Sequence, residues 1–157
     1  MVESKDELKS TSSNQAECLF CQLSDSASRK ITPIYEDDQC YAIADKFPLT
    51  PGHVLVIPKQ HHTVILDYTS AQQIHLQRIV FKVQSALLAS NPKFKACNLL
   101  LNDGKASGQH IPHTHWHIIP RQRYDTLRLL INLLTRFVNP LNYVSTRTIN
   151  LNFDHET

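Results

Sequence analysis

The sequence lacks three features that would assign it to a membrane or to nucleic acid. No apolar run approaches the roughly 18 residues that a membrane-spanning helix needs. The start, MVESKDELKSTSSNQAE, has neither the basic nor the apolar region of an export signal. The formal charge is only +2, from 16 basic and 14 acidic residues spread along the chain. We therefore expect a cytoplasmic protein with neither nucleic acid nor a membrane as its partner.

Glycine is also scarce, and the composition is not that of a disordered or fibrous chain. Only three glycines occur in 157 residues, while 41% of the residues are hydrophobic and 19% charged, as in globular proteins. This length suits one domain. We expect residues 1–16 to be a flexible tail and residues 17–124 to form the domain core. Residues 125–157 should form a helix and a tail, packed on the core or at a dimer interface.

The hydrophobic pattern predicts an α+β domain. Short β-prone runs flank a hairpin turn at Asp37-Asp38, and the helix-period pattern after Ser70 suggests a capping box with Gln73. A second amphipathic helix should follow Asp125 or Thr126 and stop at Asn139-Pro140. Further strands are expected at residues 53–57, 96–102 and 113–119, and the alternation at residues 149–153 leaves an added edge strand or a subunit contact open. The resulting fold is about five strands in a mainly antiparallel sheet with two helices.

Three histidines alternate along the last predicted strand. On a regular strand, His113, His115 and His117 would lie on one face and Trp116 on the other. The outer two Cα atoms would then be about 13 Å apart, which is too far for all three to ligate one metal comfortably. A metal site that uses some of them and a nucleophilic imidazole both remain open.

The surrounding residues resemble the signature of the histidine triad (HIT) nucleotide hydrolases. The resemblance is carried by residues 108–121, GQHIPHTHWHIIPR, by residues 51–61, PGHVLVIPKQH, and by Asp45 and Asn102-Asp103-Gly104 in the family's order. It implies a HIT-like fold, a homodimer and an AMP-containing purine nucleotide as substrate. The third histidine, His117, is similar to the hydrolase branches, whereas the nucleotidylyltransferase branch has glutamine there.

The resemblance also assigns catalytic roles. His115 would attack the α-phosphate of a nucleoside phosphoramidate or a (di)nucleoside polyphosphate and form a covalent nucleotidyl-histidine. Water would then release the nucleoside monophosphate. His117 would neutralise the phosphate, and His53 and His113 would belong to the same histidine network.

Four further residues are implied to bind substrate. Asp45 would accept hydrogen bonds from the ribose hydroxyls, and Asn102 and Gln109 would bind phosphate or leaving-group oxygens. The family usually has Ser or Thr after this glutamine, whereas the present sequence has His110. An imidazole there can donate a hydrogen bond and carry charge at lower pH, which leaves the leaving-group preference open.

Cysteine is present as one close pair, Cys18 and Cys21, and two single residues. A Cys-x-x-Cys can be redox-active, but no strand–helix unit of the thioredoxin type is expected around it. In the prokaryotic-type HIT proteins that the sequence resembles, the pair binds structural zinc together with residues equivalent to His61 and His113. His62 is an alternative ligand, and Cys40 and Cys97 should be buried small hydrophobic residues.

These observations favour a zinc-stapled HIT nucleotide hydrolase or phosphoramidase. Two other classes of function remain as alternatives. One is a purine-nucleotide-binding interaction module without useful turnover. The other is a metal-dependent hydrolase in which the triad holds the catalytic ion, so that a chelator would abolish activity at once.

Overall fold

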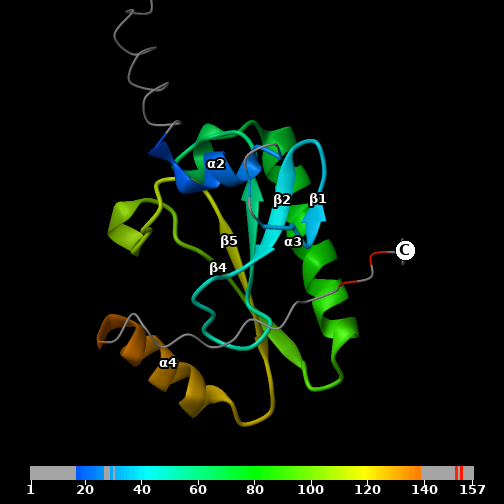
Figure 1. The fold of residues 1–157 in the computed structure, drawn as a ribbon, viewed down its shortest axis with the longest axis vertical. Helices are drawn as coiled ribbons and strands as arrows, with labels where there is room; N and C mark the ends of the chain where they lie inside the picture. The colour runs from blue at the N-terminus through cyan, green and yellow to red at the C-terminus, as the bar shows by residue number, and fades with distance from the viewer. Residues whose placement is uncertain (1–16, 27–28, 30, 139–150, 152, 154–157) are drawn as a thin grey trace, which may run out of the picture.

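An antiparallel five-stranded sheet organises the computed structural model, which describes residues 17–26, 29, 31–138, 151 and 153. The strands follow the order β1-β2-β3-β5-β4, and each pair of neighbours is antiparallel (Figure 1). The predicted α+β class and five-stranded sheet are therefore confirmed. The expectations for residues 1–16 and Ile149 lie outside the described residues. The strands are β1 Tyr35–Glu36, β2 Cys40–Ala44, β3 Val54–Pro58, β4 Ala96–Leu101 and β5 Trp116–Arg121.

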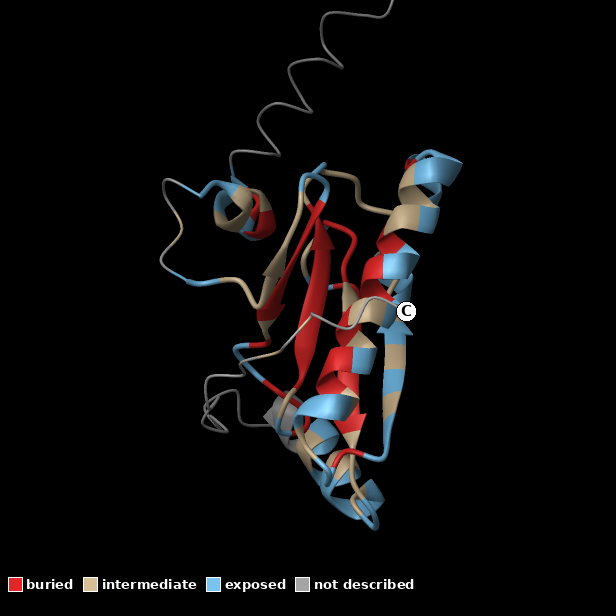
Figure 2. Ribbon diagram, turned by 90° about the vertical axis from the view of Figure 1, so that its right-hand side faces the viewer, coloured by how far each residue is buried: buried red, intermediate tan, exposed pale blue. Residues whose placement is uncertain are grey.

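The long helix α3, Ser70–Ser90, covers one face of the sheet (Figure 2). Strand side chains alternate between the two faces, so every second residue of β2, β3 and β5 meets this helix. The result is one apolar cluster in which each residue is less than a tenth exposed. Its members are Cys40, Ala42, Val54, Val56, Leu76, Ile79, Val80, Val83, Leu87 and Ile118.

The intervening strand residues form a second core on the opposite face. Tyr41, Ile43, Leu55 and Ile57 pack there against Cys18 and Phe20 of the amino-terminal segment. Phe20 belongs to a short helix, α2, Leu19–Ser24, which the sequence pattern did not lead us to expect. Six residues are too few for a helical period to stand out, and tertiary packing of Phe20 fixes the segment instead. This second face also carries the histidines.

The predicted start of α3 is wrong by one residue. Thr69, not Ser70, is the N-cap, and it forms the capping box with Gln72. Gln73 instead donates its side-chain N–H groups to the carbonyls of Ile65 and Tyr68. Ile65 lies in a short 3-10 helix, η1, Ile65–Asp67. The sequence allows two capping boxes, Thr69 with Gln72 and Ser70 with Gln73, because both pairs have the same spacing. The position at which the helix begins decides between them.

The last strand begins later than expected. We expected a strand from His113, but β5 starts at Trp116, so only His117 of the three histidines lies within the strand. The His113 N–H donates to the Ile111 carbonyl, and the Thr114 N–H donates to the His62 carbonyl. These bonds pull residues 113–115 away from the sheet. The prediction of three imidazoles in a row on one strand face is therefore wrong.

The β1–β2 hairpin turns at Asp37-Asp38, as predicted. The Asp37 carboxylate accepts hydrogen bonds from the backbone N–H groups of Gln39 and Cys40. Burial alone would raise the pKa of Asp37, but these bonds, with others from His75 and Tyr35, hold it below its ordinary value. The carboxylate is therefore ionised at neutral pH and fixes the turn.

Gly52 should tolerate no side chain. Its φ is +88°, and a Cβ there would lie 2.8 Å from the Phe94 ring. We expect Gly52→Ala to lower the free energy of unfolding by about 2 kcal/mol through backbone strain and overlap together. Chemical denaturation measures this loss. Gly108→Ala is the matched control, because its φ is +85° with nothing within 4 Å, and an equal loss in the two variants would contradict the overlap.

The second predicted helix is α4, Thr126–Val138. It begins directly after Asp125, and its Asn132 donates to the Leu49 carbonyl in the loop between β2 and β3. Leu127 and Leu134 are both about two-thirds exposed, so the other described residues do not cover its apolar face. Within the described ranges, no helix combines the length and apolar character needed to cross a bilayer.

Candidate functional site

The register of the sheet brings Asp45, His53 and His117 together on the face opposite α3. Ala44 pairs with Val54, and Leu55 pairs with His117. Asp45 and His53 directly flank the first pair, so all three candidate residues project from the face that carries the second core. Each of them is less than a tenth exposed. The three candidate residues thus converge although up to 72 positions separate them in the sequence.

A chain of close contacts links these three residues. The His53 Nε2 lies 3.0 Å from the His117 Nδ1. The Asp45 carboxylate lies 3.3 Å from the His53 Nδ1 and 4.0 Å from the His117 Nδ1. A positive charge on either imidazole would therefore be close to a buried carboxylate, which favours it electrostatically. This arrangement can hold a proton beside an anionic ligand.

The hydrogen-bond partners indicate which nitrogen of each imidazole carries the proton. The Leu49 N–H points at the His53 Nδ1 at 3.2 Å, and a backbone N–H can only donate. The proton of neutral His53 then sits on Nε2 and is donated to the His117 Nδ1. Neutral His117 consequently carries its own proton on Nε2. The Leu49 N–H therefore determines, through His53, that the Nε2 of His117 is a hydrogen-bond donor.

His115 lies immediately before β5 and beside His117, with ring centroids 4.9 Å apart. Its Nδ1 is 2.7 Å from the His113 carbonyl oxygen. A carbonyl only accepts, so the Nδ1 of His115 must donate and its Nε2 carries the lone pair. A neutral imidazole held by one nitrogen is the arrangement required for nucleophilic attack by the other.

His113 points in a different direction from His115 and joins Cys18, Cys21 and His61. One donor atom from each of the four residues lies within 4.8 Å of the others. The His113 Nδ1 is 3.5 Å from the Cys18 sulfur and 3.6 Å from the Cys21 sulfur. Tetrahedral zinc with ordinary Zn–S and Zn–N bonds separates sulfur from nitrogen by about 3.6 Å. The four donors therefore fit a zinc ion in number, type and spacing.

The protonation of this cluster also suits a metal. The His113 Nε2 is 2.8 Å from the Pro58 carbonyl, so that nitrogen donates and Nδ1 presents its lone pair to the sulfurs. Burial lowers the pKa of His113 to about 4, and the imidazole is therefore neutral at pH 7. Burial, followed by the neighbouring Cys18, raises the pKa of Cys21 to about 12 when no cation is present. A bound cation would reverse that effect on the thiol.

The remaining predicted site residues have different surroundings. Leu101 pairs with Trp116 at the end of β4, and Asn102 follows directly after this pair. Gln109 is buried, and its amide N–H donates to the Thr63 carbonyl. His110 is exposed. His62 packs on Tyr68, with ring centroids 4.6 Å apart, and His61 is the histidine that joins the cysteine cluster.

Phe20 was missed by the sequence analysis. Its ring lies edge-on to both His113 and His115, with centroids 5.8 Å and 5.0 Å away. Phe20 therefore contacts both the cysteine cluster, through His113, and the nucleophile candidate. Leu19 and Phe20 both lie between Cys18 and Cys21, and only the structure shows that Phe20 is the buried one.

Comparisons with known proteins show which family shares this sequence. A family model described as HIT domain matches residues 28–124. The chain is 38% identical over 117 residues to adenylylsulfatase HINT3 of Arabidopsis thaliana, covering 74% of this chain and 58% of that protein. It is 33% identical to an uncharacterised HIT-like protein of Saccharolobus solfataricus, covering 69% of this chain and 76% of the relative.

Two solved structures share the fold. A zinc-bound histidine triad family protein from Mycobacterium smegmatis superposes with a TM-score of 0.66 at 31% identity, covering 78% of this chain and 93% of that one. A protein from Sulfolobus tokodaii described as a hypothetical histidine triad nucleotide-binding protein gives a TM-score of 0.62 at 35% identity, covering 69% of this chain and 71% of that one.

Proposed function

This chain belongs to the HIT domain family, and we propose that it is a nucleotide hydrolase with His115 as its nucleophile. The observation that carries the proposal is the hydrogen bond from the His115 Nδ1 to the His113 carbonyl. That bond leaves the lone pair of His115 on Nε2. The neighbouring His117 accepts from His53 at Nδ1 and therefore carries its own proton on Nε2. A nucleophile and a phosphate-binding donor therefore stand side by side.

In the first step, the Nε2 of His115 would attack the α-phosphorus of a nucleoside phosphoryl compound. The new P–N bond forms as the bond to the leaving group breaks, and the leaving group departs with that electron pair and takes a proton from solvent. The Nε2–H of His117 would donate to a phosphate oxygen. Asp45, close to both His53 and His117, would stabilise positive charge on this pair as negative charge develops on the phosphate.

In the second step, water would attack the same phosphorus and the P–N bond would break. His115 regains its lone pair, the proton lost by the water passes to solvent, and a nucleoside monophosphate is released. Asp45 would also accept the ribose hydroxyls, while Asn102, Gln109 and His110 would contact phosphate or leaving-group oxygens. We assign these residues to substrate binding because Asn102 directly follows Leu101, which pairs with Trp116 next to His115, and the other two lead into the His113 segment.

We further propose that Cys18, Cys21, His61 and His113 bind a structural zinc ion. The sulfur–nitrogen spacings of 3.5 and 3.6 Å support a tetrahedral site, and a related structure is described as zinc-bound. Bound zinc would join the amino-terminal helix to the sheet and hold the strand entry that carries His115. Thiolate ligands of this kind suit the reducing cytoplasm.

The leaving group is proposed to be an amine, a phosphate chain or sulfate on an adenosine monophosphate unit. The relative from Arabidopsis is named an adenylylsulfatase, which adds adenylyl sulfate to the phosphoramidates and dinucleoside polyphosphates that the histidine pattern suggests. His110 is exposed at the start of the loop before His113, where its imidazole can donate a hydrogen bond to a leaving-group oxygen.

The proposal is tested by the mass of the intact protein after a brief acid quench. The enzyme is incubated separately with an adenosine phosphoramidate, diadenosine polyphosphate and adenylyl sulfate. We expect an adduct of one AMP, and the substrate with the fastest burst identifies the leaving-group class. A folded protein that binds AMP, but forms no adduct and releases no AMP from any of the three substrates, would instead be a nucleotide-binding module.

We also propose that two copies of the chain form a homodimer, with residues 17–124 as the core and α4 at the interface. β4 is at the end of the sheet order, so one of its backbone edges faces no other strand among the described residues. Leu100 on this strand is 43% exposed, and several leucines of α4 are exposed as well. An open edge beside apolar side chains suits pairing with a second copy.

Leu100→Lys should therefore produce a monomer. A charge at this edge position opposes strand pairing, and we expect the dimer dissociation constant to rise at least about 10-fold. Analytical ultracentrifugation over a concentration series measures it. Leu66→Lys is the matched control, because Leu66 is 80% exposed and belongs to η1, outside the β4 strand. Unchanged dimerisation in the Leu100 variant would exclude this edge as the interface.

A further inference from the structure

A second group of potential metal ligands lies on the other side of the sheet, between the β1–β2 hairpin and α3. Asp37 of the hairpin turn, Cys40 at the start of β2 and His75 of α3 each place one donor atom within 4.8 Å of the others. Cys40 is 2% exposed, whereas the side chains of Asp37 and His75 are 22% and 30% exposed. The group is therefore anchored in the core and reachable from solvent.

The carboxylate of this group is already oriented. The Asp37 Oδ1 accepts the backbone N–H groups of Gln39 at 2.8 Å and Cys40 at 2.7 Å. Its Oδ2 accepts the Tyr35 hydroxyl at 3.0 Å and lies 2.9 Å from the His75 Nε2. Outer hydrogen bonds of this kind hold a carboxylate in place in metal sites. Hydrogen bonds therefore already hold the Asp37 carboxylate in one orientation before any cation binds.

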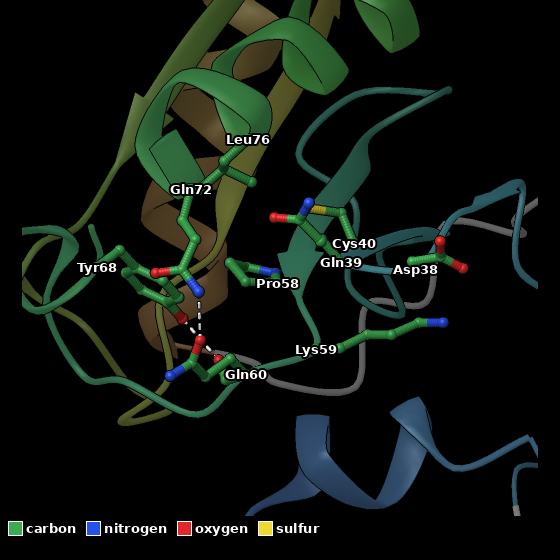
Figure 3. Close-up of a pocket in the computed structure, with 9 residues that line it drawn as sticks. All are labelled: Asp38, Gln39, Cys40, Pro58, Lys59, Gln60, Tyr68, Gln72 and Leu76. Atoms are coloured by element: carbon green, nitrogen blue, oxygen red, sulfur yellow. Dashed lines mark hydrogen bonds between the residues drawn. The ribbon is translucent and has the colours of Figure 1, made fainter. Parts of the chain in front are cut away.

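A cavity adjoins the group. Cys40 lines it together with residues of β3 and of the first turns of α3, and its volume is about 160 Å³ (Figure 3). A water molecule needs roughly a tenth of that space. Gln60, Gln72 and Tyr68 line the same cavity and supply polar atoms. Space for a solvent ligand therefore exists on the side of the group where Cys40 lies.

We propose that Asp37, Cys40 and His75 bind one divalent ion of the zinc class, with a water from the cavity as the fourth ligand. Thiolate, imidazole and carboxylate together suit zinc or cobalt and do not suit magnesium or calcium, which prefer oxygen ligands alone. On binding, the Cys40 thiol gives its proton to solvent. His75 exchanges its Nε2 proton for one on Nδ1, so that Nε2 can ligate.

Such an ion would attach the hairpin to α3. These two elements share the apolar core but meet here through polar groups, of which the hydrogen bond from His75 to Asp37 is one. Metal bonds would replace that exposed contact by a stronger one. This site does not depend on the proposed hydrolase activity or on the cluster of Cys18, Cys21, His61 and His113, and it lies on the opposite face of the sheet.

The test is cobalt binding to the full chain that has first been loaded with one equivalent of zinc. We expect a second equivalent to bind, with the charge-transfer absorption of a cobalt–thiolate bond. Cys40→Ala and His75→Gln should each lose that equivalent. Tyr35→Phe should keep the stoichiometry and weaken binding by at least about 10-fold, because it removes only an outer hydrogen bond.

Two controls keep the result specific. Cys97→Ala removes a half-buried thiol outside the group and should bind like the natural chain. Cys21→Ser should lose the first equivalent and retain the Cys40-dependent one, so failure of the zinc cluster and failure of this site give different results. Circular dichroism checks that each variant is folded. No thiolate band beyond the first equivalent, or an unchanged band in folded Cys40→Ala, would overturn the proposal.

Discussion

Replacing His115 by Ala should abolish turnover while leaving the protein folded. The nucleophile is the one group whose loss removes the covalent route entirely, and we expect kcat to fall by about 10³- to 10⁶-fold. The side chain packs against Phe20 and His117, so some loss of stability will accompany the loss of activity. Rapid-quench kinetics with the substrate that gives the fastest burst measures the change, and the AMP adduct should vanish with it.

Two variants calibrate that result. His117→Ala should lower kcat by about 10²- to 10⁴-fold, because it removes a charge-stabilising donor and retains the nucleophile. His62→Ala should keep nearly full activity, since His62 packs on Tyr68 outside the histidine pair. If His115→Ala retained a tenth of the activity, direct attack by water would replace the covalent mechanism.

Removing the zinc cluster should produce the largest loss of stability. Cys21→Ser takes away one of four ligands, and structural zinc sites supply much of the folding free energy of small domains. We expect the free energy of unfolding to fall by at least about 3 kcal/mol, together with the loss of one bound zinc. Thermal denaturation and elemental analysis measure the two quantities. Cys97→Ser is the control, because that half-buried thiol lies outside the cluster.

Chelation distinguishes this structural role from a catalytic one. With structural zinc, activity should decline only as the protein unfolds, since no step of the proposed reaction uses the ion. Activity that disappears immediately on chelation, while circular dichroism is unchanged, would favour the metal-dependent hydrolase considered from the sequence.

The strand pattern was enough to predict the sheet, because alternating apolar residues report directly which face is buried. Val54, Val56 and Ile118 meet α3, as strand periodicity requires. The path of residues 113–115 was not predictable in this way. It depends on hydrogen bonds from His113 and Thr114 to Ile111 and His62, and no local pattern encodes the second of these contacts.

The candidate site shows the same division. The identities of the nucleophile and of the zinc ligands came from a motif, and their roles stay predictions. The tautomers came only from the structure, since they depend on the Leu49 N–H and on the carbonyls of His113 and Pro58. Backbone groups have no signature in a sequence, because every residue carries them. Phe20 was missed for a related reason, namely that α2 is too short to show a period.

The ladder between β3 and β5, in the middle of the sheet, is short. β3 and β5 share three register pairs, from Val54 to Val56, whereas β4 and β5 share six. The chain is thus divided into two hydrogen-bonded units, and the contact from His53 to His117 crosses the boundary between them. Opening of the β3–β5 ladder would separate His53 from His117 while the strand pairing within each unit stays intact. Because the backbone groups of His53 and Lys59 pair with residues flanking β2, it is the amides of Val56 and Trp116 that face each other between β3 and β5. Their exchange would therefore report the fraction of molecules in which His53 and His117 are in contact, independently of global unfolding.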